Sequence, residues 1–292
     1  MVDRIPVHPG ISRFVGDYDA FVLDLWGVIH DGVKLYPGVA DTLGRLKALG
    51  KPYVMLTNAP RRAASIKRAM ARMGLAEDLA PNVMSSGEAT WLALRDRANG
   101  WLAGLGNRCL HIGPERDNGL FDGLDVEKVE AVEAAGFIVN TGPWEDDETV
   151  ADYEDTLQAA ARRGLRMICA NPDLEVIRGG KRIICAGALA QRYEALGGAV
   201  RYYGKPYRPI YDTCFATLGL SDPRRILAIG DSLRTDIAGA DGIGMDAVLV
   251  IGGIHGDEFE AGGDSVAVES RLAEACTRAG HIPIAAIPAF LW

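Results

Sequence analysis

The sequence of 292 residues lacks long hydrophobic runs and has fewer basic than acidic residues. No stretch approaches the roughly 18 uninterrupted apolar residues of a membrane span. The first ten residues carry charges and two prolines but no apolar core, so we expect no secretory signal. The 31 Lys and Arg stand against 39 Asp and Glu, and a nucleic-acid surface would need clustered basic residues. We therefore expect neither a membrane nor a nucleic-acid partner, whereas a small anionic ligand needs only local donors.

Cysteine is also scarce, and its five copies are widely scattered. Their number is odd, and no two form a C-x-x-C pair, so the sequence predicts no disulfide framework. We expect reduced, mostly buried thiols and a cytoplasmic location. The cysteines are Cys109, Cys169, Cys185, Cys214 and Cys276.

What the sequence does contain is a regular alternation of apolar segments. Hydrophobic residues make up 48% and charged residues 24%, a mixture typical of globular proteins. Short apolar runs alternate with helical patterns, which predicts βαβ units and an α/β fold with a parallel sheet. The predicted strands are residues 20–25, 53–56, 82–84, 109–112, 137–139, 167–169, 200–203, 226–229 and 247–251. The predicted helices are residues 39–49, 61–73, 88–98, 150–163, 188–196, 208–218 and 236–240.

Two turn-forming pairs interrupt this alternation and suggest a second domain. The chain length gives a soft expectation of two domains. Asn99-Gly100 and Gly197-Gly198 are the interruptions, although such pairs also occur in ordinary loops. We predict that residues 1–99 and 199–292 build one core and that residues 100–198 form an inserted α/β domain.

Polar side chains follow four of the predicted strands. They are Asp24, Thr57-Asn58, Lys205 and Asp231, and Asp236 comes five residues after the last. Ligands of open α/β sheets bind beyond the carboxyl ends of the strands. Each residue alone has an ordinary explanation, such as a helix cap or a surface lysine. Together and in this order they suggest one site with an aspartate nucleophile, a hydroxyl and amide donor, a cation and two acidic metal ligands.

This order of residues resembles the four motifs of the haloacid dehalogenase superfamily of phosphate-transferring hydrolases. The insertion between the second and third motifs resembles the class IIA, NagD-like branch, which includes sugar-phosphate, nucleotide and pyridoxal-phosphate phosphatases. The resemblance extends from about Asp19 to Ile254 and implies a Rossmann-like parallel-sheet core with an inserted α/β cap. Further matching segments are Ile29-His30-Asp31-Gly32, Pro37-Gly38, Leu56-Thr57-Asn58, Asn171-Pro172-Asp173 and Gly204-Lys205-Pro206.

The resemblance implies a Mg²⁺-dependent phosphatase that acts on a small phosphorylated metabolite. Asp24 would attack phosphorus and form an aspartyl phosphate, a known use of carboxylate nucleophiles. Lys205 would neutralise charge, while the Thr57 hydroxyl and the Asn58 backbone N–H would hold phosphate oxygens. The metal would remove the repulsion between carboxylate and phosphate. Its implied ligands are Asp24, Asp231, Asp236 and the backbone carbonyl of Trp26.

One position departs from the family pattern. The first motif of these phosphatases is Asp-x-Asp-Gly, in which the second Asp is the general acid/base, but here it is Asp24-Leu25-Trp26-Gly27. An indole N–H is only a donor, and loss of an acid/base costs on the order of 10²–10⁴-fold in rate.

Three alternatives stay open. His30 or Asp31 supplies the proton, or the leaving group needs little protonation, or the protein binds a phosphorylated ligand without efficient turnover. The last alternative makes it a catalytically impaired binding or regulatory protein. A dehalogenase is disfavoured because Asp231, Asp236 and Lys205 suit a metal-assisted phosphate reaction.

The inserted domain is the expected source of specificity. In this branch the cap covers the site and contacts the leaving group, so we predict that Asn171 and Asp173 belong to a substrate loop. A structural Asx-Pro turn explains the same residues equally well. Members of the branch often form dimers through the cap, which leads us to expect a homodimer.

Overall fold

The computed structural model describes residues 4–98, 100–178, 181–252 and 265–292. It divides into two compact units. The first unit consists of Met1–Thr57, Ala64–Met84 and Tyr211–Trp292, and the second consists of Asn58–Ala63 and Ser85–Ile210. Among the helices in these described ranges, none has both the length and the apolar character that crossing a membrane requires.

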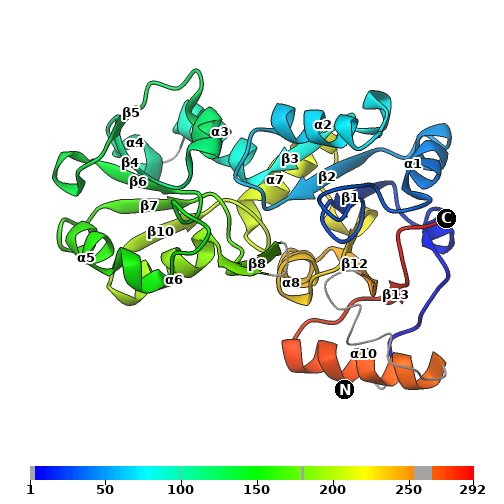
Figure 1. Cartoon of the computed structure of the whole chain (residues 1–292). Helices are drawn as coiled ribbons and strands as arrows, with labels where there is room; N and C mark the ends of the chain where they lie inside the picture. The colour runs from blue at the N-terminus through cyan, green and yellow to red at the C-terminus, as the bar shows by residue number, and fades with distance from the viewer. Residues whose placement is uncertain (1–3, 99, 179–180, 253–264) are drawn as a thin grey trace. The chain divides into compact units, whose positions relative to one another are not determined.

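The first unit is built on a six-stranded sheet with the strand order β13-β12-β11-β1-β2-β3 (Figure 1). β1 runs parallel to both β2 and β11, and β12 runs parallel to β11 and β13. Every residue of β1, β2 and β11 is buried, which explains why these strands are continuous apolar runs in the sequence. The strands are β1 (Ala20–Asp24), β2 (Tyr53–Thr57), β3 (Val83–Ser85), β11 (Ile226–Gly230), β12 (Asp246–Val250) and β13 (Ala285–Ile287).

Amphipathic helices connect these strands. In α1 (Val39–Ala48) the buried residues include Val39, Leu43 and Leu46, whose spacing places them on one helical face. The other helices that lie wholly or mostly in this unit are α2 (Ala63–Arg72), α7 (Arg208–Leu218), α8 (Ala238–Asp241) and α10 (Ser265–Ala279). Short 3₁₀ turns are η1 (Ile11–Arg13), η2 (Glu77–Leu79) and η6 (Pro223–Arg225), and η7 (Leu233–Ile237) is a π-helical turn.

The strand order contains a switch point between β1 and β11. From β1 the chain continues to β2 and β3 on one side, whereas β11, β12 and β13 lie on the other side. Leu23 pairs with Ile229, so Asp24 and Gly230 end neighbouring strands at the same edge of the sheet. Open α/β sheets bind ligands at the carboxyl ends of strands at such a switch point.

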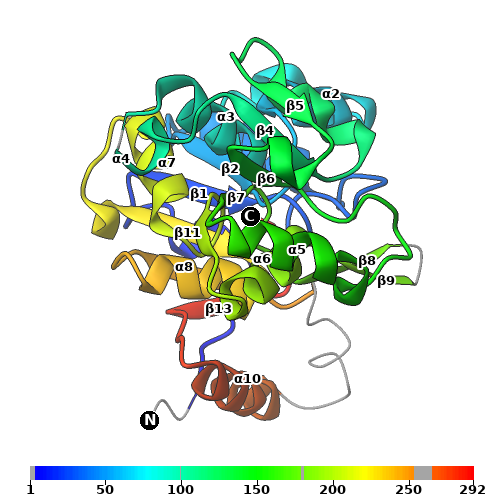
Figure 2. The ribbon, with the colours of Figure 1, turned by 90° about the vertical axis from the view of Figure 1, so that its left-hand side faces the viewer.

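The second unit has its own parallel sheet, with the order β10-β7-β6-β4-β5, and a separate antiparallel hairpin of β8 and β9. Helices α5 and α6 lie side by side and pack with β4, β6 and β7 around one hydrophobic cluster (Figure 2). The strands are β4 (Arg108–Ile112), β5 (Glu127–Val129), β6 (Phe137–Asn140), β7 (Arg166–Cys169), β8 (Glu175–Arg178), β9 (Lys181–Ile184) and β10 (Ala199–Tyr202). The helices and turns are α3 (Ser86–Asp96), α4 (Gly100–Ala103), η3 (Glu115–Phe121), η4 (Val132–Ala134), η5 (Val150–Tyr153), α5 (Glu154–Arg162) and α6 (Ala186–Ala195).

The predicted α/β class with a parallel-sheet core is confirmed, but one strand was predicted in the wrong sheet. Residues 200–203 were expected to join the core sheet, whereas β10 pairs in parallel with β7 in the second unit. The pair Gly197-Gly198 is only the loop between α6 and β10, and the apolar pattern of a strand does not specify the sheet in which it pairs. The two units therefore divide the chain at other positions than the predicted boundaries of the 100–198 insertion.

The five cysteines are free and buried, as the sequence predicted. Burial raises the pKa of the Cys109 thiol to about 12, so this thiol stays protonated at neutral pH. A buried protonated thiol is chemically inert, which gives Cys109 a packing role.

Candidate active site

Three carboxylates meet at the switch point of the first unit. Asp24 ends β1, Asp231 directly follows β11, and Asp236 lies in the π-helical turn η7. One carboxylate oxygen of each lies within 4.8 Å of the others, and the three residues are at most 7% exposed. Like charges so close together and shielded from water repel one another strongly. A buried set of carboxylate oxygens suits a hard divalent cation such as Mg²⁺, so the residues present fit the predicted metal.

Backbone hydrogen bonds hold this carboxylate cluster in place. The N–H of Leu25 donates to Asp24 Oδ1 at 2.7 Å, and the N–H of Ser232 donates to Asp236 Oδ2 at 3.1 Å. The Ser232 hydroxyl in turn accepts a hydrogen bond from the N–H of Thr235 and so caps η7. Single π-helical turns are frequent at functional sites, and this one places Asp236 beside the end of β11.

Two glycines make room for the cluster. Gly27 has a φ of +78°, and a β carbon at this position would lie 1.9 Å from Asp231 Oδ2. At Gly230 a β carbon would lie 2.1 Å from the Asp236 carboxyl carbon. Both positions therefore admit only glycine while the carboxylates stay where they are. In the sequence Gly27 stands out only as part of the first motif, which does not reveal this role.

Thr57 lies on the same edge of the first unit's sheet as the carboxylate cluster. Asp24 pairs with Leu56, so Thr57 is the next residue beyond this pair, and it is 9% exposed.

Asn58 and Lys205 are joined to each other within the second unit. The Asn58 side-chain oxygen accepts from the Lys205 N–H at 2.7 Å, and its amide donates to the Lys205 carbonyl at 3.0 Å. Lys205 itself is 3% exposed. The Asn58 side chain is thus engaged with the protein, which leaves its backbone N–H as the group predicted to bind phosphate.

The segment predicted as a substrate loop is held by contacts within the second unit. The N–H of Asp173 donates to Asn171 Oδ1 at 3.1 Å, which forms an Asx turn. Asp173 Oδ1 accepts from the Asn58 amide at 3.0 Å. A β carbon on Gly204 would lie 2.4 Å from Pro172 Cδ, so the two loops pack directly against each other. Both predicted side chains therefore have structural hydrogen bonds in this loop.

The loop after β1 contains the unusual Trp26. The Leu25 carbonyl accepts from the N–H groups of Ile29 and His30, which closes a tight turn. The Trp26 side chain is 47% exposed and makes an edge contact with the His30 ring, with 5.9 Å between centroids. His30 Nδ1 accepts from the Gly32 N–H at 3.0 Å, so a neutral His30 ring carries its proton on Nε2.

Asp31 caps the turn that follows. Its Oδ1 accepts from the N–H groups of Lys34 and Val33 at 2.8 and 2.9 Å, and these hydrogen bonds lower the pKa of the Asp31 carboxyl. The carboxylate therefore stays ionised at neutral pH, which disfavours it as a proton donor.

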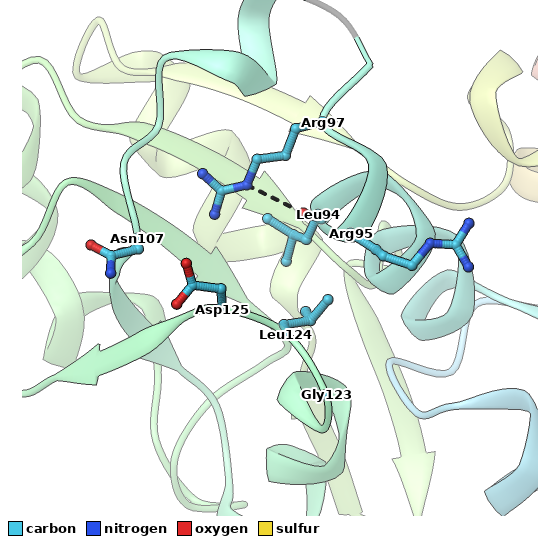
Figure 3. Close-up of a pocket in the computed structure, with 7 residues that line it drawn as sticks. All are labelled: Leu94, Arg95, Arg97, Asn107, Gly123, Leu124 and Asp125. Atoms are coloured by element: carbon cyan, nitrogen blue, oxygen red, sulfur yellow. Dashed lines mark hydrogen bonds between the residues drawn. The ribbon is translucent and has the colours of Figure 1, made fainter.

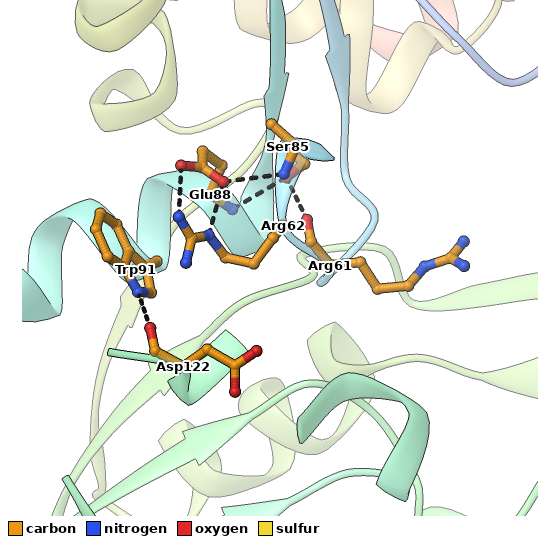
Figure 4. Close-up of polar contacts among 7 residues, drawn as sticks. Arg61, Arg62, Ser85, Glu88, Trp91 and Asp122 are labelled. Carbon is orange, nitrogen blue, oxygen red and sulfur yellow. Dashed lines mark hydrogen bonds and ion pairs between the residues drawn. The ribbon is translucent and has the colours of Figure 1, made fainter. Parts of the chain in front are cut away.

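A polar network that the sequence interpretation missed holds the loop after Asn58 (Figure 4). Glu88 accepts two hydrogen bonds from the Arg62 guanidinium at 2.8 and 3.1 Å and one from the Ala63 N–H at 2.9 Å. The Ser85 hydroxyl donates to the Arg61 carbonyl and accepts from the Glu88 N–H. The spacing Ser-x-x-Glu predicts a capping box at a helix start, but here Glu88 bonds to the neighbouring loop instead.

These contacts also set the charge state of Glu88. Burial by itself would raise the pKa of the Glu88 carboxyl, but the hydrogen bonds from Arg62 and Ala63 outweigh it and hold the pKa below its ordinary value. The Arg62 guanidinium lies 3.8 Å from the centroid of the Trp91 ring, and the Trp91 indole donates to the Asp122 carbonyl. The loop that carries Asn58 is thus fixed to helix α3 by an ionised carboxylate.

A cavity of about 360 Å³ in the second unit contains none of the predicted site residues (Figure 3). Arg95 pairs with Asp96, and Arg97 donates to the carbonyls of Leu94 and Gly106, so both guanidinium groups already bind the protein. The cavity therefore offers no argument for an anion site. Its lining consists of Leu94, Arg95, Arg97, Asn107, Gly123, Leu124 and Asp125.

Comparisons with known proteins agree with this geometry. Residues 21–127 match a family model described as haloacid dehalogenase-like hydrolase, and residues 202–274 match a model described as HAD-hydrolase-like. A solved haloacid dehalogenase-like hydrolase from Brucella suis is 35% identical with a TM-score of 0.80, and the alignment covers 97% of this chain and 100% of that one.

Two curated relatives are more distant. The sugar-phosphatase AraL of Bacillus subtilis is 29% identical over 80% of this chain and 82% of its own length. The 4-nitrophenylphosphatase of Schizosaccharomyces pombe is 23% identical over 88% of this chain and 92% of its own. The resemblance to the haloacid dehalogenase superfamily that was inferred from the motifs is confirmed, and the fold is also that of a solved structure described as a putative NagD protein, with 24% identity and a TM-score of 0.64.

Replacement of glycine by alanine should have opposite effects at Gly27 and at Gly44, because the two positions have different surroundings. Gly27→Ala forces a β carbon into Asp231 and a left-handed backbone on alanine, so we expect a loss of at least about 1–2 kcal/mol in the free energy of unfolding, together with weaker Mg²⁺ binding. Gly44→Ala lies in α1 with nothing within 4 Å and should gain about 0.5–1 kcal/mol. Denaturant unfolding and Mg²⁺ titration measure both. A Gly27→Ala protein as stable and as metal-competent as the parent contradicts this geometry.

The Glu88 network predicts a pH-dependent stability. Glu88→Gln should lower the free energy of unfolding by about 1.5–3 kcal/mol at neutral pH, because charge-assisted hydrogen bonds are lost. The pKa of the Glu88 carboxyl is lower in the folded protein than its unfolded value near 4.5. The stabilisation that the ionised carboxylate provides is therefore complete above about pH 4.5. It disappears as the pH falls further, through the folded pKa. Unfolding curves at several pH values measure the difference, with exposed Glu77→Gln as the matched control. A difference that does not change with pH would show that Glu88 acts through packing alone.

Proposed function

The chain belongs to the haloacid dehalogenase-like hydrolase family, and on that premise we propose that it is a Mg²⁺-dependent phosphatase of small phosphorylated metabolites. The observation that carries the proposal is the carboxylate cluster of Asp24, Asp231 and Asp236 at the switch point of a parallel sheet. Phosphatase names among the curated relatives support the same reaction class. A bound Mg²⁺ would offset the negative charge of carboxylate and phosphate and so permit their approach.

Asp24 is the proposed nucleophile. A carboxylate oxygen forms a bond to phosphorus while the bond from phosphorus to the ester oxygen breaks, and the leaving alcohol takes up a proton. Water then hydrolyses the aspartyl phosphate, which releases inorganic phosphate and restores the carboxylate. The hydrogen bond from the Leu25 N–H fixes one Asp24 oxygen and so orients the other.

Three further residues complete the proposed mechanism. The Thr57 hydroxyl and the Asn58 backbone N–H donate to phosphate oxygens, and the Lys205 ammonium stabilises the charge that spreads over them. The hydrogen bonds between Asn58 and Lys205 support this assignment, because they hold the two donors together.

The proton for the leaving group is the open step of the mechanism. The Trp26 indole has no acidic proton at ordinary pH, and Asp31 has a lowered pKa. His30 is the remaining side chain, and it would have to act as an imidazolium, which requires Nδ1 to give up the hydrogen bond that it accepts from the Gly32 N–H. We propose His30 as the donor where one is needed. The second candidate function, a phospholigand-binding protein with little turnover, is favoured by Trp26 alone. A homodimer, a cytoplasmic location and a substrate-contacting role for Asn171 and Asp173 stay predictions.

Hydrolysis assays on a panel of phosphate esters, with and without Mg²⁺, test the proposed function. We expect turnover only with the metal, and a loss of at least about 10³-fold in Asp24→Asn because the nucleophile is removed. Asp41→Asn is the matched control, since Asp41 lies on the exposed face of helix α1 and pairs with Arg45. A folded protein without turnover on any ester, or an Asp24→Asn protein with full activity, contradicts the phosphatase proposal.

A further inference from the structure

An exposed aromatic residue lies in the backbone segment that borders the carboxylate cluster. Trp26 follows Asp24 by two residues, so their Cα atoms are at most about 7.6 Å apart. The next residue, Gly27, lies directly against the Asp231 carboxylate. Trp26 is nevertheless 47% exposed, and Val33 in the same loop is 83% exposed. The backbone that borders the cluster therefore presents an apolar surface to solvent.

The Trp26 ring is held in place by its neighbours. Two of its ring carbons would lie 2.3 and 2.5 Å from a β carbon at Gly32, so the indole rests directly on this glycine. It also makes an edge contact with the ring of His30, which is 8% exposed and accepts a hydrogen bond from Gly32. A side chain that is fixed before binding loses little conformational entropy when a ligand packs on it.

The chemistry of position 26 favours the same kind of ligand as its exposed ring does, namely one with a planar aromatic group. Without an acid beside Asp24, the ester oxygens that leave most readily are those of acidic alcohols such as phenols. Such leaving groups are planar and aromatic, and aromatic rings stack on an indole face. An exposed, fixed indole two residues after the nucleophile and the absence of a carboxylic acid at position 26 thus favour the same class of substrate.

We propose that the Trp26 indole is the surface on which the leaving group stacks, so that the protein prefers phosphate monoesters of planar aromatic alcohols to those of aliphatic alcohols. This inference rests on the proposed function, since it requires the phosphate to bind at the carboxylate cluster. Trp26 is then a specificity-determining residue.

Two phosphate compounds with good leaving groups separate stacking from leaving-group acidity. The probes are the ester 4-nitrophenyl phosphate, whose leaving group is aromatic, and the acyl phosphate acetyl phosphate, whose leaving group is small and has no aromatic ring. The kcat/KM for 4-nitrophenyl phosphate divided by that for acetyl phosphate should fall about 3- to 10-fold in Trp26→Leu. This is the factor expected from the loss of one aromatic stacking contact. Trp26→Phe should restore most of the ratio. Trp144→Leu, the same change at a 38% exposed tryptophan of the second unit, should leave the ratio unchanged.

A binding measurement distinguishes failure of this inference from failure of the phosphatase proposal. Phosphonates are not hydrolysed, so the dissociation constants of 4-nitrobenzylphosphonate and methylphosphonate report binding alone. Trp26→Leu should weaken the aromatic phosphonate selectively. If the parent protein hydrolyses the esters but Trp26→Leu changes neither the kinetic ratio nor the binding ratio, stacking is wrong and the phosphatase stands. If no ester is hydrolysed yet binding of the aromatic phosphonate depends on Trp26, stacking stands and the phosphatase is wrong. If no ester is hydrolysed and binding of the aromatic phosphonate does not depend on Trp26, both the stacking inference and the phosphatase proposal are wrong.

Discussion

Mutual repulsion among three buried carboxylates is the constraint on which the rest of the site depends. Asp24, Asp231 and Asp236 come from distant parts of the chain, and the parallel order of β1 and β11 brings them to one edge of the sheet. Such a cluster is costly unless a cation offsets its charge. The same cation would let a negatively charged phosphate approach a negatively charged nucleophile, so one requirement explains both the ligands and the reaction.

The surrounding backbone is adapted to this cluster and to the loop that follows β2. Gly27 and Gly230 are the positions where any side chain would displace a carboxylate. In the second unit the loop that begins at Asn58 is fixed from two directions, by Glu88 on helix α3 and by the peptide of Lys205. Catalysis of phosphoryl transfer is mainly electrostatic positioning, which explains why so many of these contacts serve to hold groups still.

The sequence predicts most of this fold because its strands are buried on both faces. β1, β2 and β11 are continuous apolar runs that end in polar residues, and this pattern identifies both the strands and the site. The pairing of β10 with β7 was predicted wrongly, because pairing partners leave no periodic signal in a single sequence. The hairpin of β8 and β9 and the short strand β13 were not predicted. The roles of Gly27 and Glu88 were missed for the same reason, since both depend on contacts between segments far apart in the chain.

If the carboxylate cluster is a metal site, the protein binds a divalent cation there, and metal binding is therefore the most direct test. Calorimetric titration with Mg²⁺, together with diffraction from crystals containing Mn²⁺, measures the affinity and locates the ion. We expect one ion among Asp24, Asp231 and Asp236, and an affinity at least about 10-fold weaker in Asp231→Asn. A protein that binds no divalent ion at these residues, or that binds it equally well without the Asp231 carboxylate, contradicts the account.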